Sequence, residues 1–300
     1  PGSSSGGSSS GGSSSSGYSE TLYVSYIDVG QGDSILLGCD GEYMLVDCGE
    51  EEYADTVLEA VRGLDLKYML ASHPHTDHMG GMSEVIRKHP PETFLMPERE
   101  HTTREFKDML EAIEDKQVNA EFVYAGDEFQ LGSAYVTVVW PEIGFSDSNL
   151  NNWSAVLLVE YQGVSILLTG DSEKKVEDDY LKYIPGEIDI LKVAHHGSDT
   201  STTYPFLREI MPQYAIISVG TGNSYGHPTE DTLSRLRDAD VKLFRTDLQG
   251  DIYCISDGKT VSFTVEKNAS ADVFGGIGNN STHSTKPTDP PATNPPATNP

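Results

Sequence analysis

The hydrophobic pattern changes along the chain from short alternating runs to a mixture of runs and helical stripes. The runs come first, bounded by turn residues, and they predict strands at 21–29, 33–38 and 42–49. Asp40-Gly41, between the second and third run, suits a two-residue hairpin turn. Because these strands follow one another with short connections, we expect the chain to open with an antiparallel meander.

Helical stripes then alternate with apolar runs. Further strands are expected at 67–72, 93–97, 134–140, 188–196, 214–220 and 241–245, with hairpins at 154–171, turning at Gln162-Gly163, and at 250–266. Helices are expected at 53–64, about 81–89, 102–117, 173–183, 204–210 and 229–237. The chain thus divides into two comparable halves, each with its own strands and helices. The sheets formed by these strands need helices on their outer faces. The predicted fold class is therefore mixed α/β (α+β), a four-layer αββα sandwich.

The two ends of the chain have a different composition from the middle. Residues 1–17 are a Gly/Ser linker, and residues 268–300 form a Thr/Pro/Asn-rich linker that ends in PPATNPPATNP. Residues 18–267 show no second linker, so we expect one domain of about 250 residues there. Such linkers are typical of proteins displayed on or beyond a cell envelope. An extracellular or cell-surface location, with attachment through the linkers, is the corresponding expectation.

The formal net charge of −27 makes the predicted domain strongly acidic. Such a surface repels nucleic acid and anionic membranes at long range. A polyanionic substrate would need metal ions or local cations, for which Lys192, Arg208 and Arg245 are candidates. No apolar run reaches the ~18 residues that a membrane-spanning helix needs.

Residues 73–78, His-Pro-His-Thr-Asp-His, follow directly after an expected strand. Imidazole nitrogens and carboxylate oxygens are the usual ligands of zinc, manganese and iron. By the two-residue period, His73 and His75 leave the strand end on one side and can share a metal. Asp77 and His78 come after the turn and can reach a second one. A surface histidine cluster without a ligand role would leave the matching groups downstream unexplained.

Two downstream segments supply those matching groups. Asp171 ends an apolar run beside a glycine, where it either caps the helix at 173 or bridges two metals. His195 and His196 end the expected strand at 188–196, where adjacent side chains point to opposite faces. We therefore expect one metal ligand from this pair. We favour His195, with His196 orienting a ligand or facing the substrate.

A third segment contains His227 followed by Pro228, a residue suited to the first position of a helix. There, free backbone N–H groups would favour an anion. The segment around Ser198, before the helix at 204, offers a similar cradle, although each could be an ordinary helix start. Six of the nine histidines fall in these three segments, which argues for a common site.

With these residues in place, the chain resembles the metallo-β-lactamase superfamily, whose His-x-His-x-Asp-His signature stands at 73–78. It is most similar to the C-terminal hydrolase-like domain of ComEC/Rec2 competence proteins and its soluble relatives. The resemblance rests on IDVGQGDSILL, MLVDCG, SHPHTDHMGG, NNWSAVLLVE, ILLTGD, LKVAHHGS and SVGTGNSYGHP. These stretches run in the family's order from Tyr23 to about Gly250.

The resemblance implies two divalent ions, zinc or manganese. Their ligands would be His73 and His75 for the first ion, Asp77, His78 and His195 for the second, and Asp171 between them. It also implies a structural role for Asp47, and Gln31 and Asp33 at the mouth of the site. Many family members supply a third histidine to the first ion, but residues 146–158 contain none. We expect Asn151, Asn152 and Ser154 to orient a ligand or contact the substrate there, or the first ion to be held weakly.

A pair of divalent ions can share a hydroxide and stabilise charge that builds on a phosphoryl or acyl oxygen. We therefore expect a metal-dependent hydrolase. Asp77 or Asp171 would orient the nucleophile, and His196 or His227 would stabilise the transition state or protonate the leaving group. The resemblance and the anion-ready helix starts favour a phosphodiester, in single-stranded nucleic acid or a smaller molecule. Substrate contacts would include Ser198, Asn223 and His227.

Two other functions are compatible with the sequence. The same metal hydroxide could cleave a carboxylic ester or lactone, which predicts an apolar pocket without cationic lining. A surface-displayed binding module with lost or weak catalysis predicts substoichiometric metal and no turnover. The presence of both Asp171 and His195 argues against that last function.

Overall fold

The computed structural model describes residues 21–275. The expected Gly/Ser linker lies outside the described residues, as does most of the expected C-terminal linker. Residues 268–275 are described, and Val273 and Phe274 pack against the body there. The Arg245 guanidinium donates hydrogen bonds to the carbonyls of Val273 and Gly275. This short stretch beyond residue 267 therefore contacts the domain.

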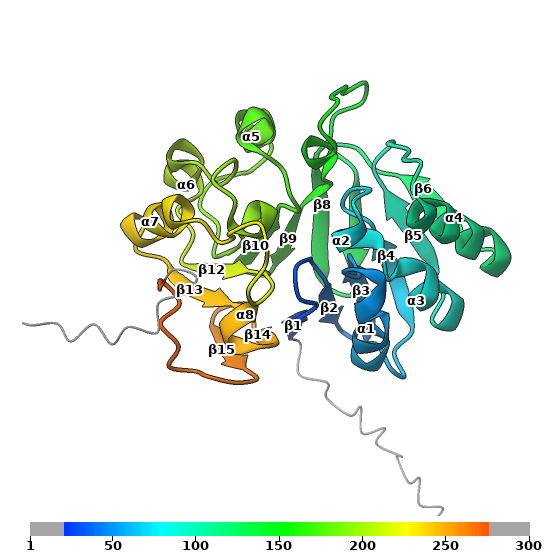
Figure 1. Cartoon of the computed structure of the whole chain (residues 1–300), viewed down its shortest axis with the longest axis horizontal. Helices are drawn as coiled ribbons and strands as arrows, with labels where there is room; N and C mark the ends of the chain where they lie inside the picture. Colours follow the sequence, from blue (N-terminus) through cyan, green and yellow to red (C-terminus); the bar gives the residue numbers. More distant parts are fainter. Residues whose placement is uncertain (1–20, 276–300) are drawn as a thin grey trace, which may run out of the picture.

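Two β-sheets face each other within the described residues (Figure 1). The strands of the first sheet are β1 (Leu22–Tyr26), β2 (Ile35–Cys39), β3 (Glu42–Val46), β4 (Leu66–Leu70), β5 (Thr93–Met96), β6 (Asn119–Phe122), β14 (Ile252–Ser256) and β15 (Val261–Val265). Those of the second are β7 (Glu128–Leu131), β8 (Ala134–Trp140), β9 (Val156–Tyr161), β10 (Val164–Leu168), β11 (Ile190–Lys192), β12 (Tyr214–Ile217) and β13 (Lys242–Arg245). The strand orders are β15-β14-β1-β2-β3-β4-β5-β6 and β13-β12-β11-β10-β9-β8-β7.

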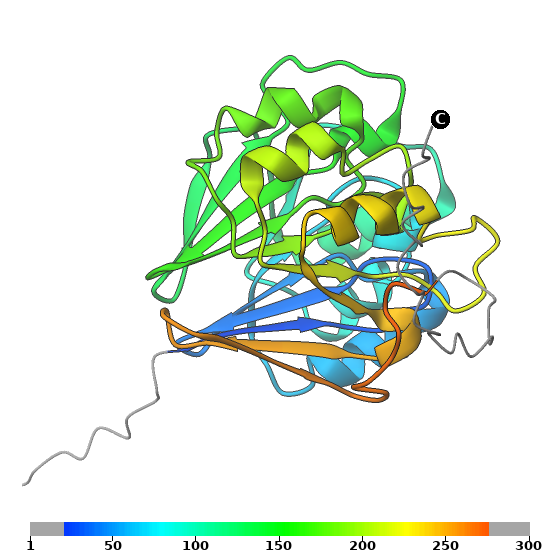
Figure 2. The same cartoon turned by 90° about the vertical axis from the view of Figure 1, so that its left-hand side faces the viewer.

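Helices cover the outer faces of both sheets (Figure 2). On the side of the first sheet they are η1 (Glu51–Tyr53), α1 (Ala54–Ala60), α2 (Thr76–Met79), α3 (Met82–Lys88) and α4 (Arg104–Lys116). The later helices are η2 (Leu150–Trp153), α5 (Lys174–Leu181), η3 (Ala194–Gly197), α6 (Tyr204–Ile210), α7 (Glu230–Asp238) and α8 (Thr246–Gln249). None of the helices between residues 21 and 275 is long and apolar enough to cross a membrane.

The core has three layers of apolar side chains, which explains the long apolar runs of the strands. Leu37 belongs to the cluster between the sheets, whereas its neighbour Leu36 packs with the helices outside the first sheet. In the second sheet, Ile166 points inward and Leu167 packs outward under the helices. Because both faces of the central strands are buried, apolar residues occur there at successive positions. The expected four-layer αββα arrangement is confirmed.

The expected turns are confirmed as well. Asp40 and Gly41 join β2 to β3 with φ of 50° and 84°, and Gln162-Gly163 joins β9 to β10. The main differences lie near the ligating residues. The segment after the first histidines forms the short helix α2, and the strand expected at 188–196 is only three residues long. Here backbone conformation is set by the packing of the site rather than by local periodicity.

Candidate metal centre

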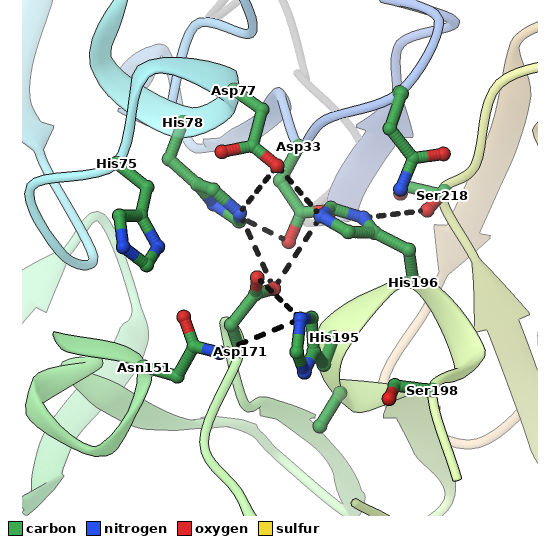
Figure 3. A network of polar contacts seen from close by, with 12 residues as sticks. Asp33, His75, Asp77, His78, Asn151, Asp171, His195, His196, Ser198 and Ser218 are labelled. Atoms are coloured by element: carbon green, nitrogen blue, oxygen red, sulfur yellow. Dashed lines mark hydrogen bonds and ion pairs between the residues drawn. The ribbon is translucent and has the colours of Figure 1, made fainter. Parts of the chain in front are cut away.

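The sheet topology brings the ligating segments to one edge. Strands β3 and β4 are parallel to each other, and so are β10, β11 and β12. The candidate groups follow the carboxyl ends of these strands, with Asp47 after β3, His73 after β4, Asp171 after β10, His195 and His196 after β11, and residues 218–227 after β12. Asp33 precedes the antiparallel strand β2 and so lies at the same edge. Segments from the whole length of the domain therefore meet there (Figure 3).

Four of these side chains converge on one point. Asp77, His78, Asp171 and His196 each offer a ligand atom, and all four atoms lie within 4.8 Å of one another. Oδ1 of Asp171 is 3.2 Å from Nε2 of His78 and 3.6 Å from Nε2 of His196. Oδ2 of Asp77 is 3.3 Å from Nε2 of His196 and 3.9 Å from Nε2 of His78. We refer to these four residues as the Asp77 cluster.

The Asp77 cluster fits a divalent ion. Ligand bonds of 2.0–2.2 Å in a tetrahedron place the ligand atoms about 3.4 Å apart, close to the separations above. Three of the converging atoms, Nε2 of His78, Oδ1 of Asp171 and Nε2 of His196, are buried and have no hydrogen-bond partner. Buried polar atoms without a partner are costly, so their convergence is explained by a ligand that they would share.

The partners of the two histidines orient these free nitrogens. Nδ1 of His78 donates to Oδ2 of Asp47 at 2.8 Å, and Nδ1 of His196 donates to the carbonyl of Ser218 at 2.9 Å. A carboxylate or carbonyl can only accept, so both rings carry a proton on Nδ1 and turn Nε2 toward the cluster. This is the arrangement that metal-binding histidines adopt.

Asp47 holds the ligand loop as well as His78. Its carboxylate accepts hydrogen bonds from the backbone N–H of Ser72 at 2.7 Å and from the Ser72 hydroxyl at 2.6 Å. The opposite side of the loop is fixed by Gly32, where a Cβ atom would lie 2.3 Å from the Asp77 carbonyl oxygen. A residue with a side chain would displace the loop. The second glycine of GQG is therefore required by its close approach to the Asp77 carbonyl.

His73 and His75 lie beside the Asp77 cluster on the other side of Asp171. Nε2 of His73 is 2.9 Å from Nδ1 of His75 and 3.9 Å from Oδ2 of Asp171. These two nitrogens and Oδ2 could hold a first ion, while Oδ1 of the same carboxylate faces the Asp77 cluster. These three atoms are fewer than the four that the Asp77 cluster offers to the second position.

Charge in the site is dominated by carboxylates. Burial lowers the pKa of His78, but Asp171 and Asp47 raise it well above its usual value. The pKa of His196 is likewise lowered by burial, yet Asp171 and Asp33 raise it to about 10. Burial raises the pKa of Asp171, whereas the imidazoles of His196 and His78 hold it well below its usual range. A buried cluster that contains several ionised carboxylates favours a bound cation.

The places of His195 and His196 are the reverse of our expectation. His196 belongs to the Asp77 cluster and is buried, whereas the side chain of His195 is 22% exposed, with its Nε2 3.8 Å from Oδ2 of Asp171. The alternation argument fails because β11 ends at Lys192. Both histidines have φ of 52°, a turn conformation that carries His196 inward.

Asp33 does not line an open mouth, in contrast to our expectation. It is buried and forms an ion pair of 2.6 Å with Lys192, whose side chain is fully buried. Its other oxygen lies 3.4 Å from Nδ1 of His196. Lys192 is therefore not available to a substrate. Gln31 does line a cleft, of about 410 Å³, beside the site.

Arg208 and Arg245 are also unsuited to the substrate contacts expected of them. Arg208 pairs with its neighbour Glu209 on the surface. Arg245 is buried and forms a bidentate pair with Asp247. None of the three basic residues that the sequence suggested is therefore free to attract a polyanion.

The histidine-free segment is built around hydrogen bonds. Nδ2 of Asn151 donates to Glu173 at 3.0 Å and lies 3.4 Å from Nε2 of His195. Asn152 instead donates to Asp147, and its backbone carbonyl accepts from Trp140. The hydroxyl of Ser154 accepts from the N–H of Asp171 at 2.9 Å and lies 3.3 Å from Nδ1 of His73. Asn151 thus faces the site, Ser154 supports two ligand candidates, and Asn152 supports the loop.

The last segment differs from the expected helix start. Helix α7 begins at Glu230 with Thr229 as its N-cap, so His227 lies before the helix rather than at its terminus. Burial and the nearby His195 lower the pKa of His227 to about 4. The ring is therefore neutral near pH 7, which disfavours it as a general acid. Ser198 is buried and bonded to Thr200. Asn223 bonds within its own loop.

Sequence reasoning missed three residues beside the site. Glu173 and Thr200 contact His195, with Oγ1 of Thr200 3.2 Å from its Nδ1 and Oε1 of Glu173 3.7 Å away. Tyr225 stacks on His227 with ring centroids 5.8 Å apart. None of them stands at a strand end or in a ligand-like spacing. Tyr225 lies within SVGTGNSYGHP, and Glu173 and Thr200 each lie two residues beyond ILLTGD and LKVAHHGS, so proximity to these segments was the available signal.

Comparison with known proteins identifies similar sequences. A model of the metallo-beta-lactamase superfamily matches residues 27–221. The chain is 30% identical over 264 residues to ComE operon protein 3 of Bacillus subtilis (strain 168), covering 81% of this chain and 34% of that protein. It is 31% identical over 223 residues to Recombination protein 2 of Haemophilus influenzae, covering 72% of this chain and 26% of that protein. The chain thus spans about a third or less of the length of these relatives.

Solved structures share the fold at low sequence identity. CmlA, a diiron beta-hydroxylase from Streptomyces venezuelae, aligns with a TM-score of 0.54 and 16% identity, over 75% of this chain and 52% of that one. The metallo-beta-lactamase fold protein YhfI of Bacillus subtilis aligns with a TM-score of 0.52 and 11% identity, over 75% and 96%. At these identities the likeness concerns the fold alone.

Proposed function

The chain belongs to the metallo-beta-lactamase superfamily, and on that premise we propose that it is a metal-dependent hydrolase that cleaves phosphodiester bonds. The observation that carries this proposal is the convergence of the Asp77 cluster with its unpartnered buried atoms. Asp77, His78, Asp171 and His196 would hold one divalent ion. His73 and His75, with the other oxygen of Asp171, would hold a second.

Divalent ions bound there would act as Lewis acids and lower the pKa of water near neutrality. The residues of the chain supply orientation and proton transfer. Asp77, whose side chain is 24% exposed, is the carboxylate of the cluster that solvent can reach and so would orient the attacking water. His195 faces the open side of the site, held by Thr200, and would contact the phosphoryl oxygen or the leaving group.

Two considerations favour a phosphodiester over a carboxylic ester. The surroundings of the site are polar, with Asn151, Glu173 and His195 at its open side, and so differ from the apolar pocket that a lactone would need. The name of one relative, Recombination protein 2, refers to recombination, which favours nucleic acid. An acidic body whose three candidate cations are all paired with carboxylates favours short or single-stranded substrates over long duplexes.

The test is a substrate screen on metal-depleted protein to which Mn²⁺ or Zn²⁺ is returned. Single-stranded DNA, a chromogenic phosphodiester, a phosphocholine ester and a lactone are compared at equal concentration. We expect turnover of the phosphodiesters only when metal is present. Hydrolysis of the lactone alone would replace the proposal with the ester-hydrolase alternative. Metal binding without turnover of any substrate would identify a binding module.

The location outside the cell stays a prediction. It depends on the linkers, which lie mainly outside the described residues.

A further inference from the structure

Three aromatic rings run outward from the metal centre. Nε2 of His195 lies 3.8 Å from Oδ2 of Asp171, and the His195 ring meets that of His227 edge-on, with centroids 5.5 Å apart. His227 in turn stacks on Tyr225 at 5.8 Å with 24° between the ring planes. His227 is 8% exposed, whereas Tyr225 is 69% exposed. One face of the Tyr225 ring is therefore covered by the site, and much of the ring is open to solvent.

The loop that carries Tyr225 is fixed by Asn223. The amide nitrogen of Asn223 donates to the carbonyls of Gly220 at 3.0 Å and His227 at 2.6 Å. Its amide oxygen accepts from the backbone N–H groups of Tyr225 at 3.2 Å and His227 at 3.1 Å. Gln31 accepts from the N–H of Gly220 and ties the loop to the first half of the domain. The backbone that carries the exposed ring is thus held in place by hydrogen bonds before any ligand binds.

An exposed tyrosine on its own needs no explanation. The position of Tyr225 differs from that of an ordinary surface residue because the loop fixes it and because its inner neighbours lead to the metal centre. Fixing an aromatic ring in advance removes the ordering cost that a mobile side chain would pay on binding. The ring is therefore suited to stack against a planar group of the substrate.

We propose that Tyr225 is a stacking platform for a nucleobase next to the phosphodiester that is cleaved. This inference rests on the proposed phosphodiesterase function and names the substrate class as base-containing nucleic acid. It accounts for binding by a chain with a net charge of −27, since stacking needs no basic groups. Acidic residues line the neighbouring cleft, among them Asp28, Glu50 and Glu52. Affinity for the phosphates alone would be weak there.

The test compares two substrates that differ only in their bases. One is a short oligothymidylate, and the other is an oligomer of equal length built from abasic tetrahydrofuran units. kcat and KM are measured with Mn²⁺ for the wild type and for Tyr225→Ala, Tyr225→Phe and Tyr225→Trp. Tyr135→Ala serves as the matched control because Tyr135 is 57% exposed and lies on strand β8, outside the loop.

For Tyr225→Ala we expect kcat/KM on the oligothymidylate to fall about tenfold or more, chiefly through KM, with no change on the abasic oligomer. The Phe and Trp variants should keep the wild-type preference, and Tyr135→Ala should match the wild type. Equal effects of Tyr225→Ala on both substrates, or none on either, would overturn the inference and leave the proposed function standing. A wild type that cleaves neither substrate would overturn both.

Discussion

Oδ2 of Asp47 lies 2.8 Å from Nδ1 of His78, so a carboxylate outside the Asp77 cluster sets the orientation of a candidate ligand. Burial raises the pKa of Asp47, while His78 and Ser72 counteract that rise. The same carboxylate holds the backbone of Ser72, directly before His73. Asp47 therefore links both halves of the proposed two-metal site.

Replacing this carboxylate should weaken metal binding without removing a ligand. In Asp47→Asn, the amide can face His78 with an N–H group, which opposes the Nδ1–H form of the ring. We expect affinity for Zn²⁺ or Mn²⁺ to fall about 10- to 100-fold, measured by competition with a chromogenic chelator. Asp40→Asn, in the exposed β2–β3 turn, is the control. Unchanged affinity in Asp47→Asn would contradict this role.

The two adjacent histidines should differ in what their loss removes. His196→Ala takes a group from the Asp77 cluster, so we expect less than the wild-type metal content after dialysis. His195→Ala should keep the wild-type metal content and lower kcat, because His195 faces the open side of the site. Metal analysis by mass spectrometry, with kcat on a phosphodiester, separates the two. The opposite result would restore the assignment that strand alternation suggests.

The buried pair of Lys192 and Asp33 should contribute to stability through charge compensation. In Lys192→Met the Asp33 carboxylate stays buried without its partner, which should cost about 3–5 kcal/mol of unfolding free energy. Urea unfolding in the presence of a chelator measures this without a contribution from metal. Adding Asp33→Asn should recover part of the loss. Additive effects of the two changes would show that the pair is not coupled.

The contribution of the loop before η2 to the stability of the domain should depend on pH through Asp147. Burial raises the pKa of this carboxyl, but Lys175, the N–H of Asn149 and the amide of Asn152 outweigh burial and lower it to about 2. A folded-state pKa below the unfolded value gives stability that is present above about pH 4 and is lost as the pH falls toward 2.

The check is the unfolding free energy of metal-free wild type and Asp147→Asn between pH 5 and pH 2. The difference in unfolding free energy between the two proteins should shrink as the pH falls from 5 to 2. Protonation of Asp147 removes its negative charge from the wild type, and the variant lacks that charge at every pH. A constant difference would mean that the ionised carboxylate does not contribute.

Much of the fold could be predicted because hydrophobic periodicity reports burial directly. The hairpin turn at Asp40-Gly41 and the helix at 204–210 follow from local signals alone. The proximity of Asp77 and His78 in the candidate metal centre was predictable because the two residues are adjacent in the sequence. The predictions that failed concern features that long-range contacts determine. The direction of His196 follows from a turn with positive φ, which no periodicity encodes.

The charged groups show the same limit. Lys192 and Arg245 look like surface cations in the sequence, but each is buried against a carboxylate. Lys192 pairs with Asp33, which precedes strand β2 of the other sheet, and Arg245 pairs with Asp247, two residues further along the chain. Burial and pairing in the folded chain decide whether a charge is available to a ligand. Sequence position alone does not carry that information.

The most direct test of the proposed function is the metal dependence of phosphodiester cleavage in the wild type and in Asp77→Asn. Each protein is depleted with a chelator, and the initial rate of oligothymidylate cleavage is followed while Mn²⁺ is returned stepwise. We predict that wild-type activity is abolished by depletion and restored by metal, whereas Asp77→Asn recovers little or none at the same metal concentrations. Full activity of the depleted wild type, or wild-type recovery in Asp77→Asn, would contradict the assignment of this cluster as the catalytic metal centre.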